Sequence, residues 1–166
     1  MKDTAILHEN ASFTAKRQLR DAIASHAFTG GFSAALIDAL ARFAMAKNFV
    51  RDETIFEQGD IANRFYLINS GYVCISSESR AGREVEIETI GAGDVLGWSW
   101  LFEPQKWQFD ARALGNTETL FFYGTPLLAH LEENPDLGFE LMSAMTGVVV
   151  RRLQKTREKL LQPSTD

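Results

Sequence analysis

The sequence predicts a mainly β fold, an antiparallel sandwich or barrel, with helices at both ends. Three observations lead to this prediction. Short apolar or alternating runs, separated by turn residues such as Gly59-Asp60 and Ser70-Gly71, fill the middle of the chain. Apolar residues at helical spacing precede and follow these runs. The length of 166 residues, 45% of them hydrophobic, suits one domain with its own core, so we expect a single domain over residues 1–166.

The first part of that domain, about residues 13–47, is expected to be helical. Ser33 is a candidate helix N-cap. Gly30-Gly31 separates the helix that Ser33 begins from a weaker helical segment around residues 15–26. After Ser33, apolar residues recur at helical spacing: Leu36, Ile37, Leu40, Phe43 and Ala44.

The central part, about residues 48–123, is expected to contain the strands. Val85 and Ile87 alternate with Glu86 and Glu88, which is typical of a strand with one solvated face. Five runs predict strands: Phe65 to Asn69, Tyr72 to Ser76, Val85 to Ile90, Gln108 to Ala113 and Thr119 to Tyr123.

The last part, about residues 124–162, is expected to be helical again. Pro126 suits a first helical turn, and a second helix is expected after Asn134-Pro135. That helix would have about 25 residues and a length of about 38 Å, which exceeds the size of such a domain. Its apolar stripe therefore either packs back on the strands or forms a coiled-coil-like homodimer. The candidate interface residues are Met142, Met145, Val149 and Leu153.

Composition argues against several classes of protein. The net charge of −5 and the pI of about 5.2 do not favour a phosphate-backbone binder. Five cations near the C-terminus are interpreted as the solvated face of a helix: Arg151, Arg152, Lys155, Arg157 and Lys159. No segment reaches the roughly 20 apolar residues of a membrane helix, and the N-terminus lacks a signal-peptide pattern. We therefore expect a cytoplasmic protein.

Residues that would carry catalysis or bind a metal are sparse. The three histidines, His8, His26 and His130, are widely separated and predict no metal site. The single cysteine, Cys74, lies in a strand pattern and is interpreted as a small buried residue. No nucleophile-elbow or Walker motif is present. The sequence therefore predicts a non-enzymatic protein without a metal or other cofactor, apart from a cyclic nucleotide or another small ligand.

Two stretches resemble the cyclic nucleotide-binding domain family. The run FEQGDIANRFYLINSGYV, residues 56–73, is similar to the front half of such a domain. The run IGAGDVLG, residues 90–97, is similar to the entry of its phosphate-binding cassette, and Arg112-Ala113-Leu114 lies where the exit strand would follow. The resemblance implies a jelly-roll-like β-roll, an antiparallel double-stranded β-helix. It points to a sensor domain of the catabolite-activator and Fnr type, without their helix-turn-helix domain.

The same resemblance identifies candidate ligand-binding residues and shows where this chain departs from the family. Trp98 follows the cassette glycine, Gly97, where the family has a glutamate that accepts a hydrogen bond from the ribose hydroxyl. Trp is only a donor and cannot replace that acceptor. Trp107 and Gln108 lie where the family has an arginine and then a serine or threonine at the phosphate. The full candidate set is Gly97, Trp98, Ser99, Trp100, Leu101, Trp107, Gln108 and Arg112.

All three tryptophans lie between residues 98 and 107, and this cluster has two interpretations. The rings could line a pocket for an aromatic or apolar ligand, or fill the former nucleotide cavity. Arg112 could bind an anion, or pair with Asp110 or another carboxylate.

The leading hypothesis is a small-molecule-sensing regulatory module that shifts its C-terminal helices. The alternatives are a dimeric protein-interaction scaffold without a ligand, and a truncated transcription regulator that contacts nucleic acid through its basic C-terminal helix.

Overall fold

The strands form two antiparallel sheets, as the sequence predicts. The structure is a computed structural model that describes residues 2–79 and 81–161, with side chains from residue 14 onward. In the described residues, one sheet has the strand order β1-β8-β3-β6 and the other has the order β2-β7-β4-β5. The bounds of the first sheet are β1 (Ala44–Phe49), β8 (Thr117–Tyr123), β3 (Arg64–Ser70) and β6 (Val95–Leu96). Those of the second are β2 (Thr54–Phe56), β7 (Asp110–Ala113), β4 (Tyr72–Glu78) and β5 (Glu84–Gly91).

The five strands expected from the sequence correspond to β3, β4, β5, β7 and β8. The short strands β1, β2 and β6 were not separately predicted. Two- to six-residue strands carry little periodicity of their own, and partner strands hold them in place.

The N-terminal helices are α1 (Lys2–Ser25), the 3₁₀ turn η1 (Ala27–Thr29) and α2 (Ala34–Arg42). Ser33 is the N-cap of α2, as predicted, and its side-chain oxygen accepts a hydrogen bond from the Leu36 amide at 3.2 Å. The predicted extension of this helical region to residue 47 is wrong. Ala44 begins β1, because residues 44–49 pair with β8 in an unbroken antiparallel register from Ala44–Phe122 to Phe49–Thr117.

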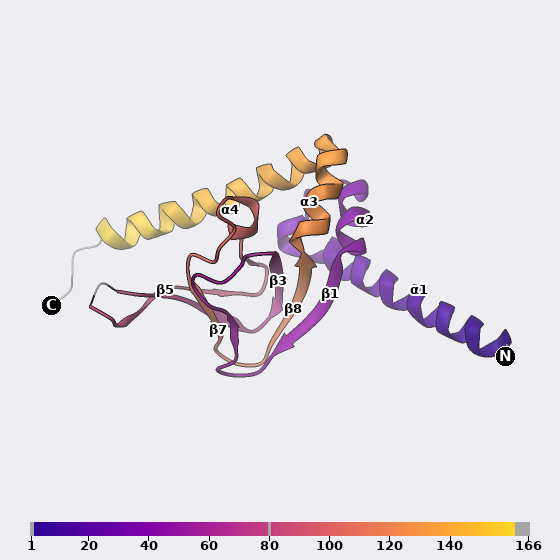
Figure 1. Cartoon of the computed structure of the whole chain (residues 1–166), viewed down its shortest axis with the longest axis horizontal. Coiled ribbons are helices and arrows are strands. Elements are labelled where there is room, and N and C mark those ends of the chain that lie inside the picture. The colour runs from indigo at the N-terminus through magenta and orange to yellow at the C-terminus, as the bar shows by residue number, and fades with distance from the viewer. Residues whose placement is uncertain (1, 80, 162–166) are drawn as a thin grey trace.

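Helices α1 and α3 (Gly124–Glu133) contact the β1-β8-β3-β6 sheet, and α4 (Pro135–Leu161) runs across to β5 of the other sheet (Figure 1). Phe65 on β3 stacks on Phe122 of β8, with the ring centroids 4.5 Å apart. On its other side Phe65 stacks on Trp100, at 5.4 Å. Trp100 in turn lies against the start of α3, where a Cβ at Gly124 would come within 2.7 Å of its ring. Trp100 is therefore a core residue between this sheet and the helices.

The last described elements are α3 and α4, and Figure 1 shows α4 running over the strands as far as the β4–β5 hairpin. The apolar stripe of α4 divides into two parts. Leu141, Met145 and Val148 are buried in the core of the chain, whereas Leu153 is 60% exposed. None of the described helices is both long and apolar enough to cross a membrane.

Candidate functional site

The candidate site is the turn between β6 and η2 (Ser99–Leu101), together with the loop that leads to β7. Gly97 in this turn has φ = +85°, a conformation that favours glycine. A Cβ at this position would lie 2.8 Å from the ring of Trp107. Because Gly97 has no side chain, the Trp107 ring can pack directly against its backbone.

Trp107 fills the space beside Gly97. Its ring stacks on Phe56 of β2 with the centroids 3.8 Å apart and the planes 9° apart, and the residue is only 2% exposed. Backbone hydrogen bonds anchor it: the Trp107 amide donates to the Asp60 carbonyl at 2.9 Å, and the Gly59 amide donates to the Trp107 carbonyl at 2.9 Å. The ring is thus part of the packed interior.

The cavity that remains at this site measures about 20 Å³. This is enough for about one water molecule, whereas ligand pockets in proteins measure roughly 300–1,000 Å³. In this conformation the site is closed by its own side chains. The cavity is lined by Phe56, Ile75, Leu96, Gly97, Trp98, Ser99, Trp107, Gln108, Phe109 and Arg152.

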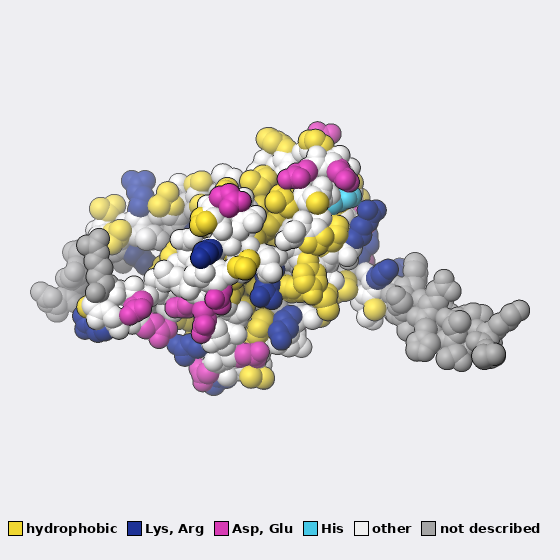
Figure 2. All heavy atoms as spheres, in the orientation of Figure 1, with side chains coloured by type: hydrophobic (Ala, Val, Ile, Leu, Met, Phe, Trp, Pro, Cys, Tyr) yellow, Lys and Arg dark blue, Asp and Glu magenta, His cyan; other side chains and the backbone are white. Residues whose placement is uncertain are grey.

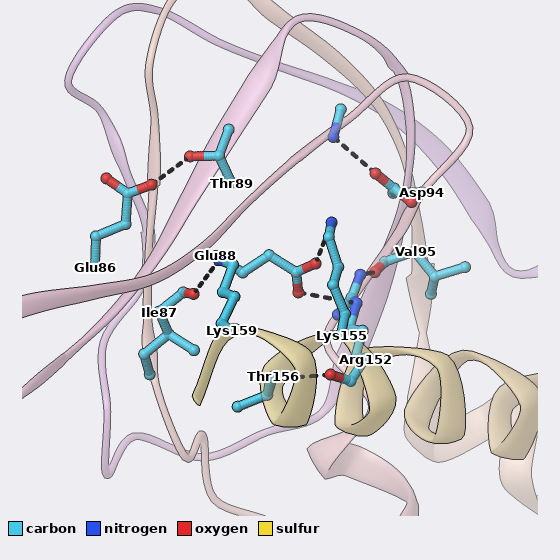
Figure 3. A network of polar contacts seen from close by, with 11 residues as sticks. Glu86, Ile87, Glu88, Thr89, Asp94, Val95, Arg152, Lys155, Thr156 and Lys159 are labelled. Atoms are coloured by element: carbon cyan, nitrogen blue, oxygen red, sulfur yellow. Dashed lines mark hydrogen bonds and ion pairs between the residues drawn. The ribbon is translucent and has the colours of Figure 1, made fainter. Parts of the chain in front are cut away.

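Arg152 closes the cavity from the side of α4. Its guanidinium carbon lies 4.8 Å from the centre of the Trp98 ring, in a cation–π contact. Its Nη2 donates a hydrogen bond to the Val95 carbonyl, and its Nε lies 3.5 Å from Glu88 Oε2. Figure 3 shows Arg152 reaching from α4 toward Glu88 and Val95, with Lys155 one turn further along the helix.

The Arg152–Glu88 pair is shielded from solvent, since the two side chains are 12% and 13% exposed. Burial lowers the pKa of the Arg152 guanidinium, and the nearby carboxylates of Glu88 and Asp94 oppose this shift. Lys155 Nζ lies 3.0 Å from Glu88 Oε1, and Lys159 Nζ donates to the Ile87 carbonyl at 3.2 Å. Three of the five cations interpreted as a solvated face therefore join α4 to β5 and β6.

The structure brings together five of the eight expected ligand-binding residues around the cavity: Gly97, Trp98, Ser99, Trp107 and Gln108. Trp100 and Leu101 do not line it, and Trp100 packs beside the helices instead. Arg112 also lies elsewhere. It is within 3.5 Å of Asp52 and 3.6 Å of Glu84, because its neighbours Ala111 and Ala113 take the buried face of β7.

Sequence reasoning missed Arg152 and Phe56 as site residues. A signal for Arg152 was present: position 152 follows the buried residues Leu141, Met145 and Val148 at helical spacing, on the inner face of α4. No local pattern distinguishes Phe56, whose role depends on stacking with a residue 51 positions later in the chain.

The closed site offers one cation and several aromatic rings, with no pair of catalytic carboxylates and no nucleophile–base pair around the cavity. Among the described residues, no group of three or more His, Cys, Asp or Glu side chains is arranged to hold a metal ion.

Two facing antiparallel sheets, a glycine turn with a short 3₁₀ helix, and a long helix over that turn define a β-roll domain with a small internal site. Comparison with protein families agrees with this class. The chain belongs to the cyclic nucleotide-binding domain family, whose model matches residues 46–134.

Curated relatives are bacterial regulators. The chain is 26% identical over 130 residues to a CRP-like cAMP-activated global transcriptional regulator of Mycobacterium tuberculosis, a match that covers 78% of this chain and 56% of the relative. It is also 26% identical over 130 residues to the anaerobic regulatory protein of Bacillus subtilis, covering 78% and 55%. The chain thus spans about half the length of the curated relatives it matches.

Solved structures share the fold. A cyclic nucleotide-binding domain from Methylobacillus flagellatus has a TM-score of 0.74 at 18% identity, covering 89% of this chain and 83% of that chain. The catabolite activator protein of Thermus thermophilus has a TM-score of 0.64 at 24% identity, covering 81% and 61%. At these identities the likeness supports the fold, and function is argued from the site itself.

Proposed function

We propose that this chain is a non-enzymatic regulatory interaction module in which the β-roll serves as a scaffold and α4 as the contact surface. The observation that carries this proposal is the cavity of about 20 Å³, closed by Trp107 and Arg152. Pockets that bind small ligands have volumes of roughly 300 Å³ or more. A cyclic nucleotide therefore needs a pocket more than ten times larger than this cavity.

The chemistry around the cavity supports the same proposal. Trp98 has no acceptor for a ribose hydroxyl. Arg112 pairs with Asp52 and Glu84 and lies outside the cavity. Each missing charge-assisted hydrogen bond costs about 1.5–3 kcal/mol of binding free energy, which weakens a cyclic nucleotide by a factor of ten or more.

The contact surface that we propose is the outer face of α4 in a homodimer. Met142 and Val149 are half-buried and Leu153 is exposed, at positions that follow one helix face. Met145, expected at the same interface, lies in the core of its own chain and is not part of the proposed surface. We place this homodimer in the cytoplasm.

A contact with nucleic acid through α4 has less support. Arg152, Lys155 and Lys159 bind Glu88 and the Ile87 carbonyl, so these cations are already engaged within the domain.

A second candidate function, ligand sensing, is favoured by Arg152. This residue lines the cavity and also holds α4 to β5, and its Nη1 is buried without a hydrogen-bond partner among the described residues. A ligand that opened the cavity would have to move Arg152, and with it α4.

Calorimetric titration with cyclic AMP and then cyclic GMP, up to millimolar nucleotide, separates the two candidates. The interaction module is expected to give no saturable heat. Saturable binding with one site per chain would instead establish the sensor. In that case Arg152→Met would be expected to change the affinity, while Arg112→Met, outside the cavity, would leave it unaltered.

A further inference from the structure

A second hollow, of about 390 Å³, lies between β1, β2, β3 and β8. It shares no lining residue with the closed cavity at Gly97. Its volume falls within the range of small-molecule pockets, roughly 300–1,000 Å³. We refer to it as the aromatic groove.

Four aromatic rings form a continuous row along this groove. The centroids of Phe49 and Tyr66 are 5.9 Å apart, those of Tyr66 and Phe121 are 5.7 Å apart, and those of Phe121 and Tyr123 are 4.5 Å apart. The row crosses three strands because Tyr66 on β3 pairs with Phe121 on β8. Figure 2 shows a hydrophobic patch over β1 and β8 with Lys and Arg side chains beside it.

Two cations lie over rings of this row. Lys47 Nζ is 5.2 Å from the centroid of Phe49, and the guanidinium carbon of Arg64 is 5.7 Å from the centroid of Phe121. Within the described part of the chain, neither cation forms an ion pair. Arg64 Nε is buried and has no hydrogen-bond partner among the described residues. A buried N–H group without an acceptor is uncommon in proteins.

The groove has few negatively charged side chains. Among the described lining residues, Glu53 is the one carboxylate, and its Oε2 accepts a hydrogen bond from the Val50 amide at 2.9 Å. With Lys47 and Arg64 the groove carries a net positive charge. Successive rings of the row meet edge to face or tilted, at 68°, 41° and 73°. Aromatic rings next to cations without ion-pair partners are complementary to a ligand that is both aromatic and anionic.

We propose that the aromatic groove binds a small planar aromatic carboxylate. The ring of the ligand packs against Tyr123, which is 47% exposed at the open end of the row, and its carboxylate accepts hydrogen bonds from Arg64 with Lys47 nearby. The competing explanation is that both cations only cover the rings, their stems lying along apolar surface with the heads in water. The two explanations differ in whether an added anion binds.

The test is calorimetric titration of the full chain with indole-3-acetate, with two matched probes. Indole-3-acetamide keeps the ring and removes the charge, and cyclohexylacetate keeps the charge and removes the aromatic ring. We expect one saturable site for indole-3-acetate, and affinities at least tenfold lower for each of the other two. Absence of saturable binding up to 10 mM (roughly the weak limit for a specific small ligand), or equal affinities for the acid and the amide, would overturn the proposal.

Variants locate the binding. Arg64→Met and Tyr123→Leu are expected to weaken indole-3-acetate at least tenfold. Lys47→Met, at an exposed position that does not endanger folding, is expected to weaken it several-fold. Arg42→Met removes an exposed cation of α2 outside the groove and serves as the control, with unchanged affinity. If the acid binds equally well to the Arg64, Tyr123 and Lys47 variants, the groove is not the site.

This inference is independent of the proposed function. Cyclic AMP and indole-3-acetate would not compete, since their sites share no residue. Binding of either one therefore leaves the conclusion about the other unchanged.

Discussion

At the residue scale, Gly97 and Trp107 form one packing unit. The positive φ of Gly97 and the 2.8 Å approach of the Trp107 ring to its missing Cβ both require a glycine there. The ring in turn occupies the space in which a ligand would otherwise lie. Two residues ten positions apart thus decide that the site is closed in this conformation.

The Gly97–Trp107 unit predicts strong coupling between two substitutions. Trp107→Leu is expected to lower the free energy of unfolding by about 2–4 kcal/mol, because it removes most of a buried ring. Gly97→Ala is expected to lower the free energy of unfolding by about 1–3 kcal/mol more when Trp107 is present than when it is replaced by leucine. The reason is that the new methyl group clashes with the ring only when Trp107 is present. Urea unfolding of the two single variants and the double variant measures this difference. Additive effects would contradict the packing unit.

His26 is another residue whose environment constrains its chemistry. Its Nδ1 accepts from the Phe28 amide at 3.2 Å, which leaves Nε2–H to donate to the Ile68 carbonyl at 3.0 Å. Burial lowers the pKa of His26 below 6.5, although the Ile68 carbonyl and Asp94 partly oppose the shift. The folded protein therefore holds His26 neutral at pH values where the unfolded chain takes up a proton.

This difference predicts how stability depends on pH. Near pH 8 the histidine is neutral in both states and contributes no slope. As the pH falls below about 6.5, the unfolded state binds a proton first, so the free energy of unfolding decreases. Urea unfolding between pH 8 and pH 5 is expected to show a smaller decrease in His26→Gln than in the parent chain. His130→Gln is the control, and a slope unchanged by His26→Gln would refute the assignment.

At the element scale, charged side chains join the inner face of α4 to β5. Arg152 and Lys155 both contact Glu88, at 3.5 and 3.0 Å. Because Glu88 is largely buried, removing one of its partners leaves a carboxylate that is poorly compensated.

Arg152→Met is accordingly expected to lower the free energy of unfolding by about 2–3 kcal/mol, less than the full cost of breaking a buried pair because Lys155 remains. Adding Glu88→Gln is expected to restore part of this loss, since no buried charge is then left unpaired. Hydrogen exchange of the α4 amides, measured with urea unfolding, should show faster exchange in the single variant than in the double variant. Equal exchange in both would mean that the ion pair does not hold the helix.

The boundary between α2 and β1 shows a limit of periodicity at the element scale. Phe43 and Ala44 continue the helical spacing after Ser33, yet α2 ends at Arg42 and Ala44 opens a strand. Hydrogen bonding to β8, some 75 residues later, outweighs the local preference.

At the scale of the whole molecule, the outer end of α4 carries apolar surface that the rest of the described chain does not cover. Leu153 is exposed there, as are Val150 and Leu160. An exposed apolar stripe on a helix is typical of an association surface.

The homodimer predicts a change of mass on substitution. Leu153→Glu is expected to convert the dimer to a monomer in sedimentation equilibrium at tens of micromolar protein (about 6–7 kcal/mol of association free energy), with an unchanged circular dichroism spectrum. Gln154→Glu adds the same charge one position further along the helix and should leave the dimer intact. A parent chain that is monomeric at these concentrations would refute the proposed interface.

Local patterns in the amino-acid sequence were enough to predict the class of this protein. The order of helices and strands was predicted from the spacing of apolar residues, the turn residues and the Ser33 cap. The family was predicted from the runs at residues 56–73 and 90–97. Each of these features depends on residues that are neighbours along the chain. It can therefore be recognised from the sequence without a structure.

The arrangement of the site, in contrast, depends on contacts between distant parts of the chain. Stacking of Trp107 on Phe56, burial of Trp100 beside α3, pairing of Arg112 with Asp52, and contact of Arg152 with Glu88 each join residues from separate elements. Whether a cluster of tryptophans lines a pocket or fills it depends on where the strands place the rings in space. The spacing of residues along the chain does not determine those positions. The same packing that completes the core therefore closes the site.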